Sequence, residues 1–175
     1  RFSQVVKDAE RFNRPGEYVA IPAGEVHWLE RIHINLYFSG PEIDSFASDL
    51  DCFQNNFNWT EFKKKYVKFP LAFTHHSLWQ ANSDFIDDDR MRLIEIYSMH
   101  GSSESRNGGG VPQKFLGSEK MGGQEFKNFS VQEILNKEKI LGIMASSDSH
   151  SGQAGEYALA AVWAPELTRT GILNA

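Results

Sequence analysis

The sequence predicts an α/β fold built on a mainly parallel sheet or barrel. Helical and strand-like patterns alternate along the chain, which favours parallel strands joined by helices over an antiparallel sandwich. Two short apolar runs, Leu71–Thr74 and Arg92–Tyr97, are typical of strands that are buried inside a parallel sheet. In such folds the loops that follow the strands carry the functional side chains, which predicts a site at the carboxyl ends of these strands.

Size and composition set the broad class. The chain has 175 residues, of which 41% are hydrophobic, and this is enough for one domain (1–175) with a core. The longest apolar run, Ala158–Ala164, is far shorter than a membrane span. A net charge of −5, with Lys63–Lys65 as the only basic cluster, argues against nucleic acid as a partner. The single Cys52 cannot form an internal disulfide. We expect a soluble protein, either cytoplasmic or periplasmic.

The first part of the chain alternates helices and strands. Phe2–Phe12 has apolar residues at helical spacing and is stopped by Pro15-Gly16. Strands are expected next, because β-forming residues follow in two short runs. We predict these strands at Tyr18–Gly24 and His33–Phe38, a helix that opens at Pro41 after Ser39-Gly40, and a second helix at Thr60–Tyr66.

The second part continues the alternation around one long loop. The residues from Gly101 to Gly123 are rich in Gly, Ser and charge and lack periodicity, which indicates a functional lid or a mobile loop. Ser130 and Glu133 form a capping-box pattern that starts a helix. The remaining predicted elements are a helix within Leu78–Asp89, strands at Ile140–Ser146 and Leu159–Trp163, and a final helix that starts at Pro165.

Imidazole and carboxylate groups follow several of these strands. Asp148 and His150 are two residues apart, so on an extended segment they project to the same face. His100 and the pair His75-His76 also follow strand-like runs, although only one member of an adjacent pair normally reaches a given ion. Alone, each of these signals is weak. Together they favour a site for zinc, manganese or iron, whose ligands are typically imidazoles and carboxylates.

Four segments carry a family resemblance: Thr74–His76, Glu95–Glu104, Ala145–Gly152 and Leu159–Thr168. They resemble a large family of bacterial proteins within the PHP superfamily, named after polymerase and histidinol phosphatase. The resemblance runs from Pro15 to the end of the chain. It implies a distorted TIM-like (β/α)7 barrel that holds two or three divalent metal ions, zinc, manganese or iron, at its carboxyl-terminal rim.

The resemblance also implies which residues bind the metals. Glu25 is the expected bridging carboxylate, and His33 is the imidazole that follows it. The remaining expected ligands are His75 or His76 and the pair Asp148 and His150. Glu95 and His100 match this family without a clear equivalent in the general superfamily pattern, so we expect substrate contacts or groups outside the ligand shell.

One departure from the superfamily concerns its first motif. The His-x-His of the opening strand is absent, since no such pair precedes Phe12. His27 lies two residues beyond Glu25, but the missing motif belongs to a different strand. We therefore expect the chain to be part of a longer enzyme and the barrel to be incomplete at the amino terminus. Alone it would be inactive or poor in metal.

The expected activity is metal-dependent hydrolysis of a small, anionic substrate, with a phosphoester first. Asp148 would hold a metal and the nucleophile, and His100 or the second histidine of the pair would protonate the leaving group. Arg106 and Lys114 would reach the anionic substrate, or else remain ordinary solvated charges. Two alternatives stay open. One is an amide or carbonyl-ester hydrolase on the same metals, and the other is a degenerate metal-binding or scaffold domain. The oligomeric state is left open.

Overall fold

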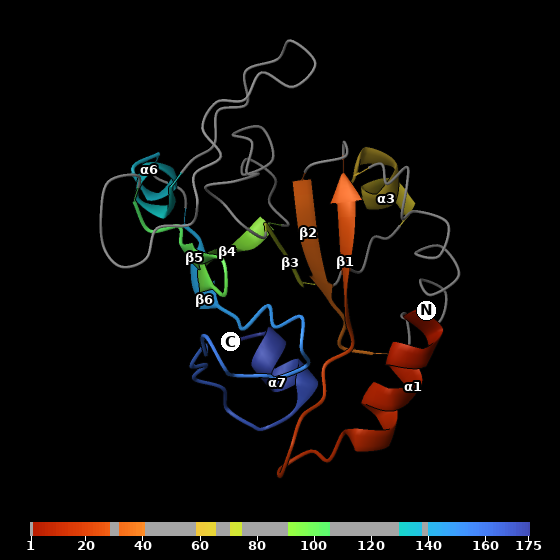
Figure 1. Cartoon of the computed structure of the whole chain (residues 1–175). Helices are drawn as coiled ribbons and strands as arrows, with labels where there is room; N and C mark the ends of the chain where they lie inside the picture. Colours follow the sequence, from red (N-terminus) through yellow and green to blue (C-terminus); the bar gives the residue numbers. More distant parts are fainter. Residues whose placement is uncertain are drawn as a thin grey trace. The chain divides into compact units, whose positions relative to one another are not determined.

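The chain forms two compact units. Its described residues contain both helices and strands (Figure 1). The computed structural model describes residues 2–28, 32–40, 59–65, 71–74, 91–105, 130–137 and 140–175. One unit combines residues 1–72 with residues 161–175, and the other comprises residues 73–160. The single domain expected from the sequence stays a prediction.

Helix α1 (Phe2–Phe12) opens the first unit, as its spacing predicts. Phe2, Val6 and Ala9 share its buried face, which is the arrangement expected for an amphipathic helix. The helix ends where the backbone N–H of Asn13 donates to Ala9 O at 3.0 Å. The chain then turns at Gly16, whose φ of +86° suits a residue without a Cβ.

A β-hairpin follows α1. Strands β1 (Ala23–Trp28) and β2 (Ile32–Tyr37) pair antiparallel, with Val26 opposite Ile34 (Figure 1). Their antiparallel pairing differs from the mainly parallel pattern predicted, because only three residues separate the strands and such a short link cannot make a parallel crossover. Among the side chains that the structure describes here, the apolar ones that are buried are those of Val26, Ile34, Leu36 and, just after β2, Phe38. Phe38 packs edge-on against Phe2 of α1, with ring centroids 5.6 Å apart.

The strand predicted at Tyr18–Gly24 overlaps β1 only at Ala23 and Gly24, whereas the prediction at His33–Phe38 is confirmed to within one residue. Tyr18 makes only an isolated bridge with Arg14, and the strand proper begins at Ala23. Pro22 accounts for the late start, because proline has no backbone N–H to donate to a neighbouring strand. The carbonyl of Pro22 still accepts from the N–H of Phe38 at 3.1 Å and thereby joins the start of β1 to the end of β2.

Two further short elements agree with their predictions. Helix α3 (Trp59–Lys65) falls within one residue of the predicted range and buries Phe62. Strand β3 (Leu71–Thr74) has the predicted bounds. The predicted helices at Pro41 and within Leu78–Asp89 lie outside the described residues, as does the predicted Gly101–Gly123 loop beyond Ser105.

Helix α7 (Arg169–Leu173) closes the first unit. Thr168 caps it by accepting from the N–H of Gly171 at 2.9 Å, so the helix begins four residues later than predicted from Pro165. The buried Arg169 of α7 donates to the carbonyls of Ala20, at 2.6 Å, and Ala9, at 3.2 Å. These bonds tie the end of the chain to α1 and to the segment that leads into β1.

The predicted strand at Leu159–Trp163 is also wrong. These residues have no regular secondary structure, and the side chain of Trp163 is 97% exposed. β-forming side chains alone do not make a strand, because the backbone needs a neighbouring strand to pair with. Within the described residues no strand pairs with this segment.

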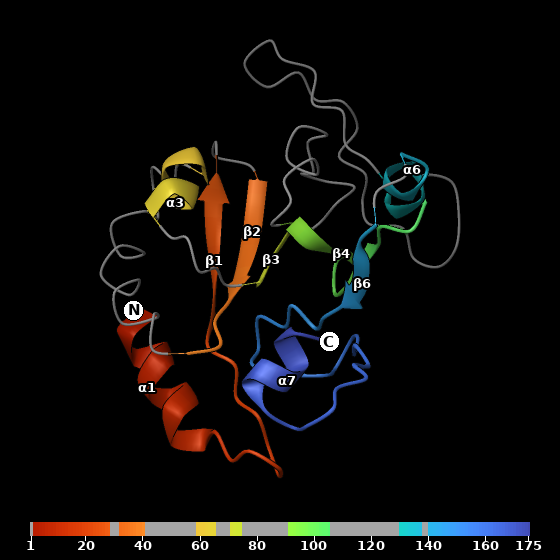
Figure 2. The ribbon, with the colours of Figure 1, turned by 180° about the vertical axis from the view of Figure 1, so that it is seen from behind.

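The second unit is built on β4 (Met91–Ser98). Strand β5 (Gly101–Ser102) pairs antiparallel with β4. Strand β6 (Gly142–Ala145) pairs parallel with β4 and lies beside it in Figure 2. Strands β4 and β6 were both predicted, and β6 is shorter than expected at each end. Among the described residues there is no closed barrel, so the (β/α)7 barrel stays a prediction.

Helix α6 (Val131–Leu135) packs on β4. The predicted capping box is present, with Ser130 and Glu133 each accepting from the other's backbone N–H. Val131 and Ile134 of the helix form a buried cluster with Ile94 of β4, and Ile96 and Leu141 pack against it. This cluster packs α6 against β4, and β6 pairs parallel with β4. In the described residues no helix is long and apolar enough to cross a membrane.

Candidate metal site

Two loops meet at the carboxyl ends of β4 and β6. The strands run parallel, so both ends lie at the same edge, where parallel sheets usually carry their functional groups. Two backbone bonds join the loops beyond the strands: Ser146 N donates to Tyr97 O at 3.1 Å, and Met99 N donates to Ser147 O at 3.2 Å. The residue after Met99 and the residue after Ser147 are therefore brought close together. These residues are His100 and Asp148.

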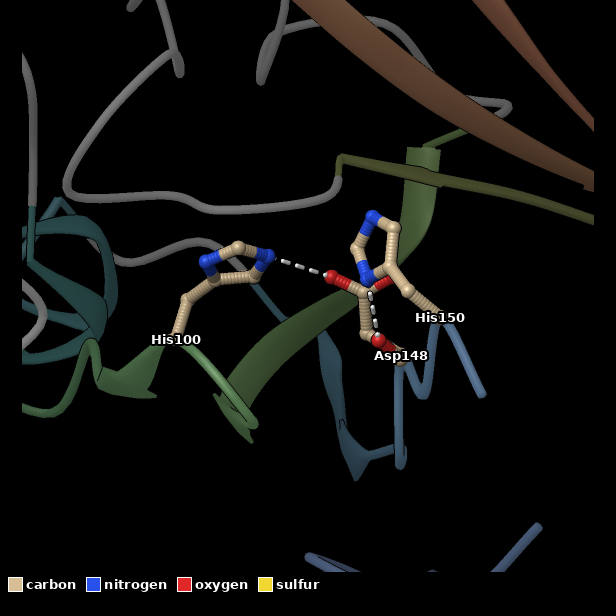
Figure 3. Close-up of side chains that lie close together, drawn as sticks. All are labelled: His100, Asp148 and His150. Atoms are coloured by element: carbon tan, nitrogen blue, oxygen red, sulfur yellow. Dashed lines mark hydrogen bonds and ion pairs between the residues drawn. The ribbon is translucent and has the colours of Figure 1, made fainter. Parts of the chain in front are cut away.

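Three side chains that can bind a metal gather at this edge (Figure 3). His100 Nε2 lies 2.9 Å from Asp148 Oδ2, and the rings of His100 and His150 are nearly perpendicular, with centroids 5.9 Å apart. One donor atom from each of the three residues lies within 4.8 Å of the others. Asp148 is the most sheltered, with 17% of its side chain exposed, against 31% for His100, while His150 is exposed. The cluster is thus open on one side.

The backbone conformation of Asp148 allows this residue to contact both histidines, His100 through its carboxylate and His150 through its carbonyl. Its φ of +46° lies in the left-handed region, which residues other than glycine rarely adopt. Aspartate tolerates this region better than most residues. The carboxylate faces His100, while the main-chain carbonyl lies 3.1 Å from Nδ1 of His150. The carbonyl can only accept, so in this contact Nδ1 carries the proton and Nε2 is free to bind an ion. The Sδ atom of Met99 lies at 3.1 Å from the same Nδ1.

Serine side chains stabilise the loop around Asp148. Gly155 N donates to Ser147 Oγ, and Gln153 N donates to Ser149 Oγ at 3.2 Å. These bonds fold the chain back after His150 through Gly152, which has a φ of +77°. The small residues expected from the sequence to leave room for a ligand therefore also shape the loop.

The three side chains are of the types that bind transition metals, and the distances between their donor atoms are near those around a bound ion. Two imidazoles and one carboxylate are ligands that zinc, manganese and iron share. Bonds of about 2.0–2.2 Å place two ligand atoms of a tetrahedral zinc about 3.3 Å apart. The His100–Asp148 distance of 2.9 Å lies below this value and the overall span of 4.8 Å lies above it, so the donors would have to shift when an ion binds.

Glu25 and His33 form a second carboxylate–imidazole pair, on the hairpin of the other unit. Glu25 lies opposite Asn35 in the ladder and His33 lies opposite His27, so the two are diagonal neighbours across the strands. His33 Nδ1 is 2.6 Å from Glu25 Oε1, and both side chains are partly exposed. Their expected roles as metal ligands stay a prediction. Their grouping with Asp148 and His150 around shared ions stays a prediction.

The remaining predicted site residues differ in outcome. His75, His76, Arg106 and Lys114 lie outside the described residues. Glu95 is fully buried in β4, where its Oε2 accepts from Ser146 Oγ at 2.8 Å. This burial favours a role outside the ligand shell over direct contact with substrate.

The structure places His100 among the candidate donors, whereas the resemblance implies a substrate contact or a group outside the ligand shell. A signal for this was present in the sequence. His100 follows the end of β4 by two residues and Asp148 follows the end of β6 by three, so a parallel pairing of these two strands places them side by side.

Comparison with known proteins adds nothing further. No model of a known protein family, no curated protein and no solved structure matches this chain. The resemblance to the PHP superfamily stays a prediction from the four segments that carry it.

Proposed function

We propose that this protein is a metal-dependent hydrolase whose metal is held by His100, Asp148 and His150. The observation that carries the proposal is the convergence of their three donor atoms within 4.8 Å. Two of these residues come from one loop and the third comes from a loop about fifty residues earlier in the chain, so proximity in sequence does not explain the cluster.

The form of the cluster supports catalysis more than a structural role. Structural zinc sites are usually closed by four protein ligands, whereas catalytic sites keep a position for water or substrate. Among the residues that the structure describes, three donors come together and His150 is exposed, so a small molecule can approach from that side. Glu25 and His33 would hold a further ion of the two or three that the resemblance implies.

Each of the three cluster residues has a defined role in this proposal. A bound ion would lower the pKa of a bound water and stabilise negative charge on a phosphoryl or carbonyl oxygen. Asp148 and Nε2 of His100 and His150 would hold the ion. The carbonyl of Asp148 would keep the proton of His150 on Nδ1, which fixes the orientation of the ring.

A phosphoester is the proposed substrate class. This choice rests on the resemblance to the PHP superfamily, since the cluster itself suits phosphoryl and carbonyl substrates equally. The substrate is expected to be small and anionic. An amide or carbonyl ester is the alternative that a substrate screen separates.

Metal content tests the proposal. The protein and the variants His100→Ala, Asp148→Asn and His150→Ala are incubated with zinc, manganese or iron, freed of excess ion by gel filtration and analysed by elemental mass spectrometry. Glu156→Gln is the matched control, because this exposed carboxylate lies in the same part of the chain and outside the cluster. We expect at least one equivalent in the wild type and the control, and a clear loss in each cluster variant.

Activity is then measured on the loaded protein with aryl phosphate mono- and diesters and with aryl carboxylic esters and anilides. Turnover of phosphoesters that is lost with Asp148→Asn supports the proposal. Turnover of carbonyl substrates alone supports the alternative hydrolase. A folded wild-type protein that binds no ion contradicts both and favours a scaffold domain.

A further inference from the structure

One side-chain hydrogen bond links β4 to the loop that carries Asp148. Ser146 Oγ donates to Glu95 Oε2 at 2.8 Å. Glu95 lies in the middle of β4 and is fully buried, and Ser146 is the first residue after β6. Because Ser146 is two residues before Asp148, this bond acts close to the candidate metal site without belonging to it.

The bond lies where the strand pairing is irregular. Glu95 is opposite Met144 and Tyr97 is opposite Ala145, so β4 has one more residue than β6 over this stretch. An extra residue of this kind forms a bulge, interrupts the regular ladder and redirects the strand. The carboxyl ends of β4 and β6 are thus held beyond the bulge by the two backbone bonds of Ser146 and Met99 and by the bond between Ser146 and Glu95.

We propose that Glu95 is a positioning residue that fixes the loop of Asp148 relative to the loop of His100 through Ser146. The proposal rests on the metal site proposed above. Glu95 is buried on β4, which packs against the core of the second unit, so its carboxylate is a fixed hydrogen-bond acceptor. It would restrain Ser146 while the side chains of His100, Asp148 and His150 adjust to an ion.

The physical basis is preorganisation. An ion binds more tightly when its ligands already stand near their final positions, because little conformational entropy is lost on binding. Substitution of residues that orient metal ligands typically lowers affinity by about 10- to 100-fold. Loss of the Ser146 hydroxyl should therefore weaken metal binding although no ligand is removed.

The test compares three serine variants. Ser146→Ala removes the bond, and Ser146→Thr keeps a hydroxyl. Ser103→Ala is the matched control, because Ser103 is a buried serine of the same unit whose Oγ has no hydrogen-bond partner among the described residues. Zinc affinity is measured by competition with a chromophoric chelator, and the visible spectrum of bound Co²⁺ reports the geometry of the ligands.

We expect Ser146→Ala to weaken zinc binding by about 10-fold or more and to alter the Co²⁺ spectrum. Ser146→Thr should restore most of the affinity, and Ser103→Ala should match the wild type in both measurements. The double variant Glu95→Gln/Ser146→Ala should lose less than the sum of the single losses, because both changes act on one bond. If Glu95→Gln does not fold, the three serine variants alone decide the question.

Two results overturn the proposal in different ways. If the wild type binds zinc and Ser146→Ala binds it equally well, Glu95 has no positioning role and the metal site stands. If the folded wild type binds neither zinc nor Co²⁺, the proposed metal site itself is wrong, and the role of Glu95 falls with it.

Discussion

Arg169 offers a test of how the first unit is held together. Its guanidinium is buried and makes two hydrogen bonds to main-chain carbonyls, from Nε to Ala20 at 2.6 Å and from Nη2 to Ala9 at 3.2 Å. A hydrogen bond that involves a charged group contributes about 1.5–3 kcal/mol. Arg169 also pairs with Glu10, but this carboxylate is 59% exposed, and such a pair contributes about 0–1 kcal/mol.

The perturbation is Arg169→Met, which removes the donors and keeps an apolar side chain of similar length. Two bonds at the lower end of the range give an expected loss of about 3 kcal/mol in the free energy of unfolding. Glu10→Gln is the control and should cost less than about 1 kcal/mol. Both values come from urea unfolding followed by circular dichroism, with the slopes compared to confirm similar transitions. A loss below about 1 kcal/mol for Arg169→Met would show that water replaces these bonds and would refute the reasoning.

Three further predictions concern other parts of the chain. Gly171→Ala should destabilise the protein by about 1–3 kcal/mol, since a Cβ there would clash with the carbonyl oxygen of Glu166; thermal unfolding measures this, and an unchanged midpoint would contradict it. Ile134→Ala should cost about 2–5 kcal/mol because the side chain is fully buried, and a urea midpoint like that of the wild type would argue against the packing of α6 on β4. Zinc affinity should fall with acidification because protons compete with the ion for its ligands, and titration calorimetry that finds the same affinity at lower pH would contradict the proposed metal site.

The sequence predicts the elements of this chain better than their pairing. The helix at Phe2–Phe12 and the capping box at Ser130 are local features, and both form as predicted. The strand expected at Leu159–Trp163 does not form, because a strand depends on a neighbour that local sequence does not specify. Strand β1 begins at Ala23 and not at Tyr18 for a local reason, since Pro22 has no backbone N–H to donate to a neighbouring strand.

In the candidate site, too, the sequence predicts local features but not the contacts that depend on strand pairing. That His100, Asp148 and His150 follow strands could be read from the sequence. That His100 Nε2 meets Asp148 Oδ2 depends on the parallel pairing of β4 with β6 and on the bulge near Glu95, which are properties of the folded chain. The left-handed backbone of Asp148 has no distinctive sequence signal, because aspartate occurs in many other conformations.

The most direct test of the metal site is to locate a bound ion. Crystals of the protein grown with zinc would be measured on both sides of the zinc absorption edge, so that the anomalous difference map shows the ion alone. The account predicts a peak within about 2.0–2.2 Å of His100 Nε2, a carboxylate oxygen of Asp148 and His150 Nε2. An ion bound elsewhere, with these three side chains unchanged and without density between them, would contradict it.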